Sequence, residues 1–125
     1  MQLPDDRRYS PEHVWALVEN NELVVGITDH AQSALGSVVS LDLPAKGQNI
    51  CTSDICGTIE SMKTASDLIA PLNARVVDIN DSVEMDPEMI NEDPYGEGWL
   101  LRLTEFDMEE YHKLLDAGSY QELIE

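Results

Sequence analysis

The sequence predicts a mainly β fold, a small sandwich or barrel flanked by short helices, and two observations predict it. From His13 onward, apolar residues alternate with polar ones over short stretches that turn residues separate. Residues 50–83 are rich in β-branched side chains, and Gly, Pro, Asn or Asp interrupts them about every 8–12 residues, as in antiparallel sheets. A chain of 125 residues suits one such domain and can bury its core without disulfides.

Strands are expected along most of the chain. Residues 1–8 are polar and are expected to be loose. A hairpin then joins strands at 14–18 and 23–27 through a turn at residues 20–21, and another strand covers 37–43. The remaining strands are expected at Gly57–Glu60, Ala65–Ala70, Arg75–Ile79 and Trp99–Thr104.

A short helix is expected between the first hairpin and the next strand, from His30 to Leu35. Asp29 can cap its N-terminus, and Gln32 stands three residues later, where the partner in a capping box belongs. Gly36 follows the last apolar position and is expected to end the helix.

The C-terminal region changes to helical periodicity. Asp107 is the expected N-cap of a helix that Ala117-Gly118 stops, and Ser119 is expected to start a last short helix. Residues 105–125 are therefore expected to form a helical cap on the same domain as residues 9–104.

The charge of the chain excludes several kinds of partner. Seven basic and 25 acidic residues give a formal charge of −18, whereas nucleic acids and anionic membranes attract clustered Lys and Arg. Such acidity either keeps a small protein soluble or matches a basic surface on a partner protein. No stretch is long and apolar enough to span a membrane, and no signal peptide is recognisable. We therefore expect a cytoplasmic monomer that binds neither nucleic acid nor membrane.

The sequence shows no sign of a catalytic or metal site. Its three histidines fit no catalytic triad, and no glycine-rich phosphate loop is present. Cys51 and Cys56 are spaced as C-x4-C, and no second pair of ligands stands at the spacing that a zinc site needs. Two readings of these cysteines stay open: separate thiols, or a pair with a redox role.

Lys63 is one of only seven basic residues, and it falls between two predicted strands. A lysine at the tip of a tight hairpin is exposed and has few side-chain neighbours, which is what an enzyme needs to modify one particular amine. The alternative is a turn lysine that serves solubility.

Several separated motifs resemble the H-protein family of the glycine cleavage system. The octapeptide around Lys63 is similar to the family's lipoyl-attachment motif, and the resemblance extends from about Tyr9 to Ile124. The other similar stretches are Val25–Gln32 with Leu35-Gly36, Ile90–Leu100, Leu114–Ala117, and Tyr9, His13 and Trp15.

The resemblance implies a lipoyl-domain fold, two small antiparallel sheets in a flattened barrel with short flanking helices and Lys63 on a hairpin tip. It implies lipoic acid joined to Lys63 as a swinging arm of roughly 14 Å, on a carrier without catalytic activity of its own. The residues implied to present the arm or to line its cleft are Glu60, Ser61, Asp67, Val14, His30 and Ala31. The implied partners are a lipoate-protein ligase or lipoyl transferase and dihydrolipoamide dehydrogenase.

Val14 departs from the family pattern, which usually has Glu between the residues matching His13 and Trp15. Loss of a charge-assisted hydrogen bond of about 1.5–3 kcal/mol to a bound amine weakens its retention roughly 10- to 100-fold. Glu12 does not replace it if this stretch is a strand, because neighbouring residues of a strand point to opposite faces. Compensation by Asp67 or Glu60 is the other possibility.

This departure favours, at the level of sequence, the H-protein-like lipoate-binding branch of cytoplasmic sulfur oxidation, whose partner is a heterodisulfide-reductase-like complex. The alternative is a true glycine cleavage H protein that carries an aminomethyl group between glycine decarboxylase and aminomethyltransferase. A second alternative is a redox protein using Cys51 and Cys56, or a binding module that is never lipoylated.

Overall fold

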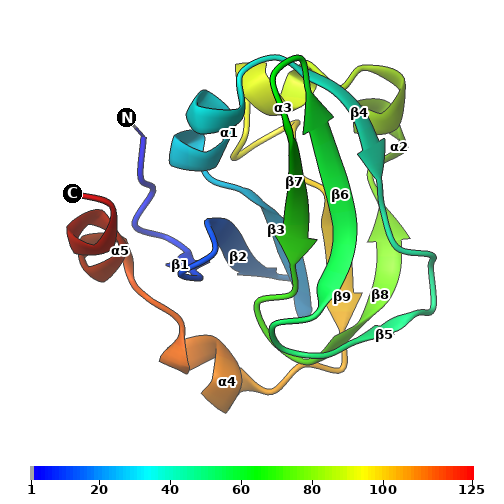
Figure 1. Cartoon of the computed structure of the whole chain (residues 1–125). Coiled ribbons are helices and arrows are strands. Elements are labelled where there is room, and N and C mark those ends of the chain that lie inside the picture. The colour runs from blue at the N-terminus through cyan, green and yellow to red at the C-terminus, as the bar shows by residue number, and fades with distance from the viewer. Residues whose placement is uncertain (1) are drawn as a thin grey trace.

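The computed structural model describes residues 2–125, which form two antiparallel sheets and five short helices (Figure 1). The larger sheet has the strand order β1 (Arg8–Tyr9), β2 (Val14–Glu19), β3 (Glu22–Ile27), β9 (Leu101–Thr104), β8 (Ala74–Ile79) and β5 (Asn49–Ile50). The smaller sheet has the order β4 (Val38–Asp42), β6 (Ile55–Ser61) and β7 (Ala65–Ile69). The mainly β prediction with two antiparallel sheets is confirmed, although these sheets do not close into a barrel.

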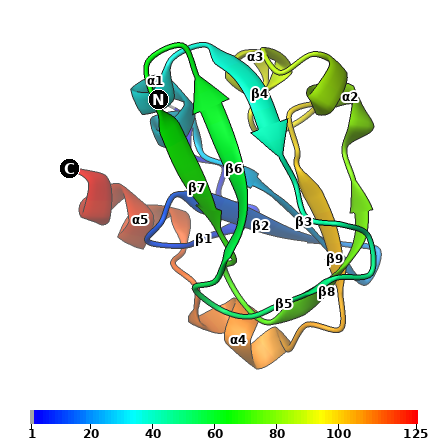
Figure 2. The ribbon, with the colours of Figure 1, turned by 45° about the vertical axis from the view of Figure 1, so that its right-hand side comes forward.

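The helices lie at the margins of the sheets (Figures 1 and 2). They are α1 (Asp29–Leu35), α2 (Asp81–Met85), α3 (Met89–Glu92), α4 (Met108–Lys113) and α5 (Ala117–Ile124). In Figure 2, α1 and α3 lie at the end of the molecule to which the β6–β7 hairpin points, whereas α4 lies at the opposite end. None of the helices in residues 2–125 is long and apolar enough to cross a membrane.

The β2–β3 hairpin has the turn that the sequence predicts. Val14 pairs with Ile27 at one end and Glu19 with Glu22 at the other, so the loop consists of two residues. Both of these, Asn20 (φ 53°) and Asn21 (φ 65°), have the left-handed conformation that two-residue hairpin turns require and that Asn tolerates. The local sequence is sufficient to set this register.

The N-cap of α1 is Thr28 rather than Asp29. Thr28 has extended dihedrals, and its Oγ1 accepts a hydrogen bond of 3.2 Å from the backbone N–H of Ala31. Asp29 is the first helical residue, and its carboxylate accepts from Gln32 Nε2 at 2.7 Å. The predicted Asp29 cap and its capping box are therefore wrong, because a capping box pairs side chains with backbone N–H groups, whereas Asp29 and Gln32 are joined through their side chains within the first turn.

The C-terminal helices differ from their predicted bounds. Asp107 caps α4 as expected, by accepting from the Glu109 N–H at 2.9 Å, but α4 ends at Lys113. Leu115 is extended and exchanges two backbone hydrogen bonds of 2.8 Å with Tyr9. The side chain of Asp116 then caps α5, so the predicted break at residues 117–118 and restart at Ser119 are wrong. Pairing with β1, distant in sequence, overrides the local helical pattern.

Four elements are absent from the sequence prediction. Strands β1 and β5 have two residues each, which is too short for a detectable alternation. Helix α3 has four residues and no side-chain cap, and α2 has five. These elements depend on contacts with the rest of the fold.

Two apolar clusters hold the fold together. The main core lies between the sheets, and a second cluster on the other face of the larger sheet joins Tyr9, Trp15, Val24 and Tyr120 of α5. Strand β2 is thus buried on both faces, Val14 and Ala16 on one and Trp15 on the other. This explains why its apolar residues run together.

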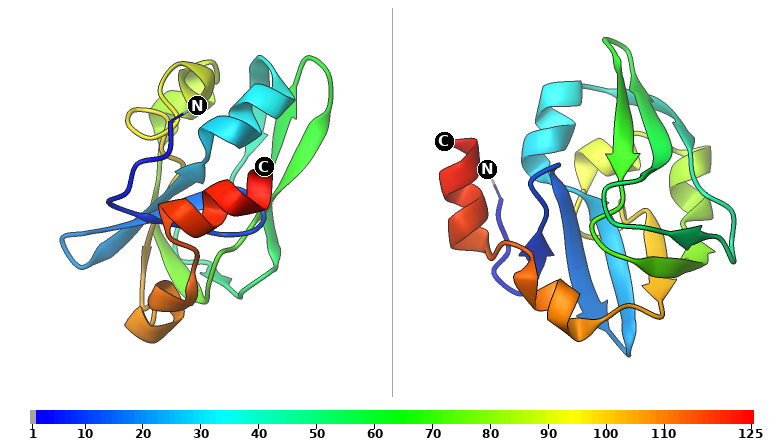
Figure 3. Two further views of the ribbon diagram at one scale, coloured as in Figure 1. Left: turned by 90° about the vertical axis from the view of Figure 1, so that its left-hand side faces the viewer. Right: turned by 60° about the horizontal axis from the view of Figure 1, so that its bottom comes forward.

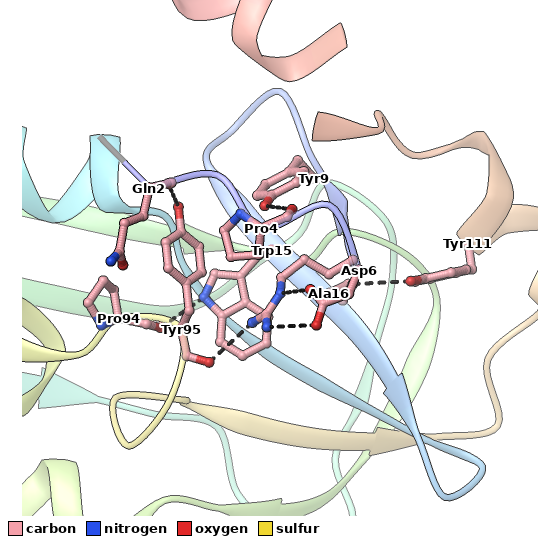
Figure 4. A network of polar contacts seen from close by, with 10 residues as sticks. Gln2, Pro4, Asp6, Tyr9, Trp15, Ala16, Pro94, Tyr95 and Tyr111 are labelled. Atoms are coloured by element: carbon pink, nitrogen blue, oxygen red, sulfur yellow. Dashed lines mark hydrogen bonds and ion pairs between the residues drawn. The ribbon is translucent and has the colours of Figure 1, made fainter. Parts of the chain in front are cut away.

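The N-terminal segment lies along the second cluster (Figure 4). The Arg7 guanidinium lies 4.7 Å from the ring centroid of Trp15 and 5.4 Å from that of Tyr95. The Tyr95 hydroxyl donates to the carbonyl of Gln2 at 2.7 Å. The expected looseness of residues 1–8 concerns motion and stays a prediction, and Met1 lies outside the described residues.

Candidate functional site

Lys63 stands at the tip of the β6–β7 hairpin, which projects beyond the body of the protein (Figure 3, right). The turn is closed by a backbone hydrogen bond of 2.8 Å from Ser61 to Thr64. The Ser61 hydroxyl oxygen also accepts from the N–H groups of Lys63 (3.2 Å) and Thr64 (3.1 Å). Within residues 2–125 the exposed Lys63 ammonium has no ion pair. Its amine is therefore free for chemical modification.

The aliphatic stem of Lys63 lies over the backbone of Gly36, the residue that ends α1. A Cβ atom on Gly36 would lie 3.1 Å from Cε of Lys63 and 3.7 Å from Nζ. Leu35, the preceding residue, lines a cleft. Thr64, the residue after Lys63, lines the same cleft, so the lysine stands at its rim.

The cleft has a volume of about 290 Å³ and lies between β7 on one side and α1 with the start of β2 on the other. Apolar side chains from both sheets and α1 form much of its wall, among them Ile27, Leu35 and Leu68. Strand β7 is an edge strand of its sheet, so its outer backbone groups also face this region. The space suits an extended apolar chain with a polar end.

The predicted site residues divide into two groups. Val14, His30, Ala31 and Asp67 line the cleft. Ser61 shapes the turn instead. The exposed Glu60 pairs in register with Ser40 and Ala65, on the face of the sheet away from the core.

Glu12 lines the cleft as well, contrary to the expectation from strand alternation. Strand β2 begins only at Val14, and His13 interrupts the extended backbone with a φ of 70°. Residues 10–13 form a turn, in which the Ser10 carbonyl accepts from the His13 N–H at 3.1 Å. Glu12 therefore does not continue the alternating directions of the strand. No local signal marks this turn.

A polar cluster that the sequence did not suggest adjoins the cleft at His13 and His30, which line it. The Tyr120 hydroxyl of α5 is hydrogen-bonded to Nδ1 of His13 (2.7 Å) and Oγ1 of Thr28 (2.8 Å). The rings of His13 and His30 are 4.8 Å apart. Burial and the neighbouring His30 lower the pKa of His13, and Glu12 acts in the opposite direction.

The two cysteines lie in different environments. Cys51 is exposed at the start of a turn, in which its carbonyl accepts from the N–H of Asp54 at 2.9 Å. Cys56 is buried between the sheets, and its thiol donates to the carbonyl of Leu68 at 3.4 Å. Burial raises the pKa of Cys56 to about 11, so its thiol is protonated at neutral pH. This favours two separate thiols. No cluster of potential metal ligands occurs in the part of the chain that the structure describes.

An unpaired lysine on a hairpin tip, beside an apolar cleft and carried by two antiparallel sheets, defines a lipoyl-domain carrier. The chain belongs to the glycine cleavage H-protein family, because the model of that family matches residues 7–125. Members of this family carry a lipoyl group on a lysine and have no catalytic activity of their own.

Similar proteins support this assignment over the whole chain. The glycine cleavage system H protein of Thermus thermophilus is 48% identical over 125 residues, which are 100% of this chain and 98% of that protein. The H protein of Aeromonas salmonicida is 46% identical and is matched over 98% of this chain and 96% of its own. The crystal structure of the Mycobacterium marinum H protein superposes with a TM-score of 0.87 at 36% identity and covers 96% of this chain and 97% of that chain.

The comparisons favour the glycine cleavage alternative over the sulfur-oxidation branch that the sequence preferred. That preference rested on Val14, and relatives of high identity outweigh one substitution. Glu12 also lines the cleft, so this segment still brings an acidic residue to it in spite of Val14.

Proposed function

We propose that this chain is the lipoyl carrier of a glycine cleavage system, with the lipoyl group attached through an amide to Nζ of Lys63. The observation that carries the proposal is the free amine of Lys63 on a projecting turn at the rim of the cleft. When bound, the lipoyl group would supply a strained disulfide that is reduced as it takes up a one-carbon amine. The cleft fits such a group, since its apolar wall matches the hydrocarbon chain.

The residues of the chain divide the remaining work. Ser61 fixes the turn that presents Lys63 to the modifying enzyme. The apolar wall, with Val14 and Ala31 among its members, excludes water from a load held in the cleft. His30 lies on the α1 side of the same wall.

Glu12 and Asp67 give the cleft its specificity for a positively charged load. They approach from opposite walls, Glu12 from the turn before β2 and Asp67 from β7. Such a pair of carboxylates binds an ammonium group in preference to a neutral or anionic load. Because Glu12 is exposed, its contact contributes up to about 1 kcal/mol, a factor of about five in retention.

The partners follow from this function. They are a lipoate-protein ligase or lipoyl transferase, glycine decarboxylase, aminomethyltransferase and dihydrolipoamide dehydrogenase. The charge of −18 favours basic surfaces on these enzymes around the entrances that admit the arm. The proposal includes the cytoplasmic monomer that the sequence led us to expect.

Mass spectrometry of the intact protein tests the attachment site. The protein is incubated with lipoate, ATP and a lipoate-protein ligase, and Lys63→Arg is compared with Lys113→Arg, a change at another exposed lysine. We expect one lipoyl increment on the wild type and on Lys113→Arg, and none on Lys63→Arg. A wild-type protein that stays unmodified, or an increment that persists in Lys63→Arg, contradicts the proposal.

The load is tested on the lipoylated protein with glycine and glycine decarboxylase. We expect an aminomethyl increment whose loss in buffer is about two- to five-fold faster in Glu12→Gln. Glu19→Gln, at the far end of the β2–β3 hairpin, is the matched control and should behave like the wild type. A lipoylated protein that ignores glycine contradicts the proposed pathway.

A further inference from the structure

The segment that joins α1 to β4 supports the tip of the β6–β7 hairpin. We call residues 36–38 the seat. Gly36 accepts no other residue here, because its φ of 79° and ψ of −159° are open only to glycine. The end of the Lys63 side chain also packs closely on it, since a Cβ at Gly36 would lie 3.1 Å from Cε of Lys63. The end of the Lys63 side chain thus lies against the seat.

The backbone of the tip is attached to the same segment. The N–H of Met62, the residue before Lys63, donates to the carbonyl of Ser37 at 3.0 Å. Val38 pairs with Ser61 in the register of β4 and β6. Both the main chain and the lysine side chain of the tip are thus placed by residues 36–38.

The side chain of Asn91 holds the two ends of the seat. Its Oδ1 accepts from the N–H of Val38 at 2.9 Å, and its Nδ2 donates to the carbonyl of Gly36 at 2.8 Å. The same Nδ2 donates to Oε1 of Gln32 in α1 at 3.0 Å. We call these three hydrogen bonds of Asn91 the clamp. Only a carboxamide supplies an acceptor and two donors in this space.

Asn91 is itself fixed to the core through its helix. It belongs to α3, whose Ile90 is fully buried in the main core. Helix α3 packs against α1 near the hairpin tip (Figure 1). The clamp therefore transmits the rigidity of the core to a hairpin tip that otherwise projects into solvent.

We propose that Asn91 is a positioning residue for modification of Lys63: it keeps residues 36–38 in the one arrangement from which the hairpin tip offers its amine. The proposal rests on the proposed function, since it assumes that Lys63 is the lipoylated residue. When the competent arrangement of a substrate is only partly populated, its apparent affinity falls by that fraction. Removal of the clamp should thus raise KM of the lipoate-protein ligase for this protein and leave kcat unchanged.

The test compares lipoylation kinetics of the full unmodified chain in wild type, Asn91→Ala and Asn91→Asp. Asn73→Ala is the matched control, because Asn73 also ties two segments, by accepting from Thr52 N–H (2.8 Å) and donating to Glu110 (3.2 Å). Asn73 lies in the loop between β7 and β8, away from the hairpin tip. Hydrogen exchange of the Met62 amide is measured in each protein.

We expect KM to rise about 5- to 30-fold in Asn91→Ala, equivalent to about 1–2 kcal/mol, with kcat within two-fold of wild type. Exchange at Met62 should accelerate in the same variant. Asn91→Asp retains the acceptor for Val38 but places a carboxylate oxygen against the Gly36 carbonyl and Oε1 of Gln32, two acceptors, so its KM should rise at least as much as that of Asn91→Ala. It remains informative if Asn91→Ala does not fold. Asn73→Ala should match wild type in both measurements.

An unchanged KM in folded Asn91 variants, or an equal rise in Asn73→Ala, overturns the positioning role. An unmodified wild type instead contradicts the proposed function. The Met62 exchange rates then still decide whether Asn91 orders the tip.

Discussion

The hydroxyl of Tyr120 links the C-terminal helix to the wall of the cleft, and its removal tests whether residues 105–125 are part of the domain. Tyr120 is fully buried in α5, and its hydroxyl is bonded to His13 and Thr28 at 2.7 and 2.8 Å. Tyr120→Phe deletes both hydrogen bonds and keeps the ring that stacks on Tyr9 with centroids 4.9 Å apart. The change thus isolates the polar link.

The magnitude follows from the two bonds. A neutral hydrogen bond contributes about 0.5–1.5 kcal/mol, so Tyr120→Phe should lower the free energy of unfolding by about 1–3 kcal/mol. For a chain of this size that is a fall of about 3–12 °C in Tm. Thr28 keeps its bond to Ala31, which holds the loss within this range.

Tyr111→Phe is the matched control, because its hydroxyl donates to the Ala16 carbonyl at a long 3.4 Å and contributes little. Thermal and urea unfolding of both variants gives the comparison. We expect a loss of less than about 0.5 kcal/mol for Tyr111→Phe. Equal losses in the two variants, or an unchanged Tyr120→Phe, would refute the reasoning and leave α5 as an appendage packed only by its apolar residues.

Three further predictions concern the thiols, the histidine and the sheet. A thiol reagent at pH 7 should modify Cys51 quickly and Cys56 only after unfolding, since burial raises the pKa of Cys56 to about 11; equal rates in the folded protein would restore a redox role for the pair. Because the pKa of His13 is lowered, the folded state binds its proton more weakly than the unfolded chain. The stability due to this difference is complete above about pH 6.5 and is lost as the pH falls below it, so urea midpoints at pH 7.5 and 5.5 should differ less in His13→Asn than in wild type. Gly26→Ala places a Cβ 2.7 Å from the Trp15 ring and should destabilise by about 1–3 kcal/mol in thermal unfolding, and a Tm equal to wild type would contradict the close approach.

Local signals in the sequence determined the parts of the fold that depend on neighbouring residues. The two asparagines at residues 20–21 specify a two-residue hairpin, and Asp107 specifies a helix start, because each acts on backbone groups within a few positions. The position of Lys63 on a hairpin tip was predictable in the same way, from two flanking strands and from the motif around it. The prediction of a lipoyl carrier depended on several sequence motifs that follow one another along the chain as they do in the family.

Only the tertiary structure decided how distant segments meet around that lysine. The turn at His13 brings Glu12 to the cleft, and nothing in the neighbouring sequence announces a positive φ there. The pairing of Leu115 with Tyr9 replaces a helix that the local pattern favoured. Asn91 reaches residues 36–38 across more than fifty positions of sequence. A local rule records what a residue prefers, whereas these contacts arise because the packed core brings together groups that the chain alone leaves apart.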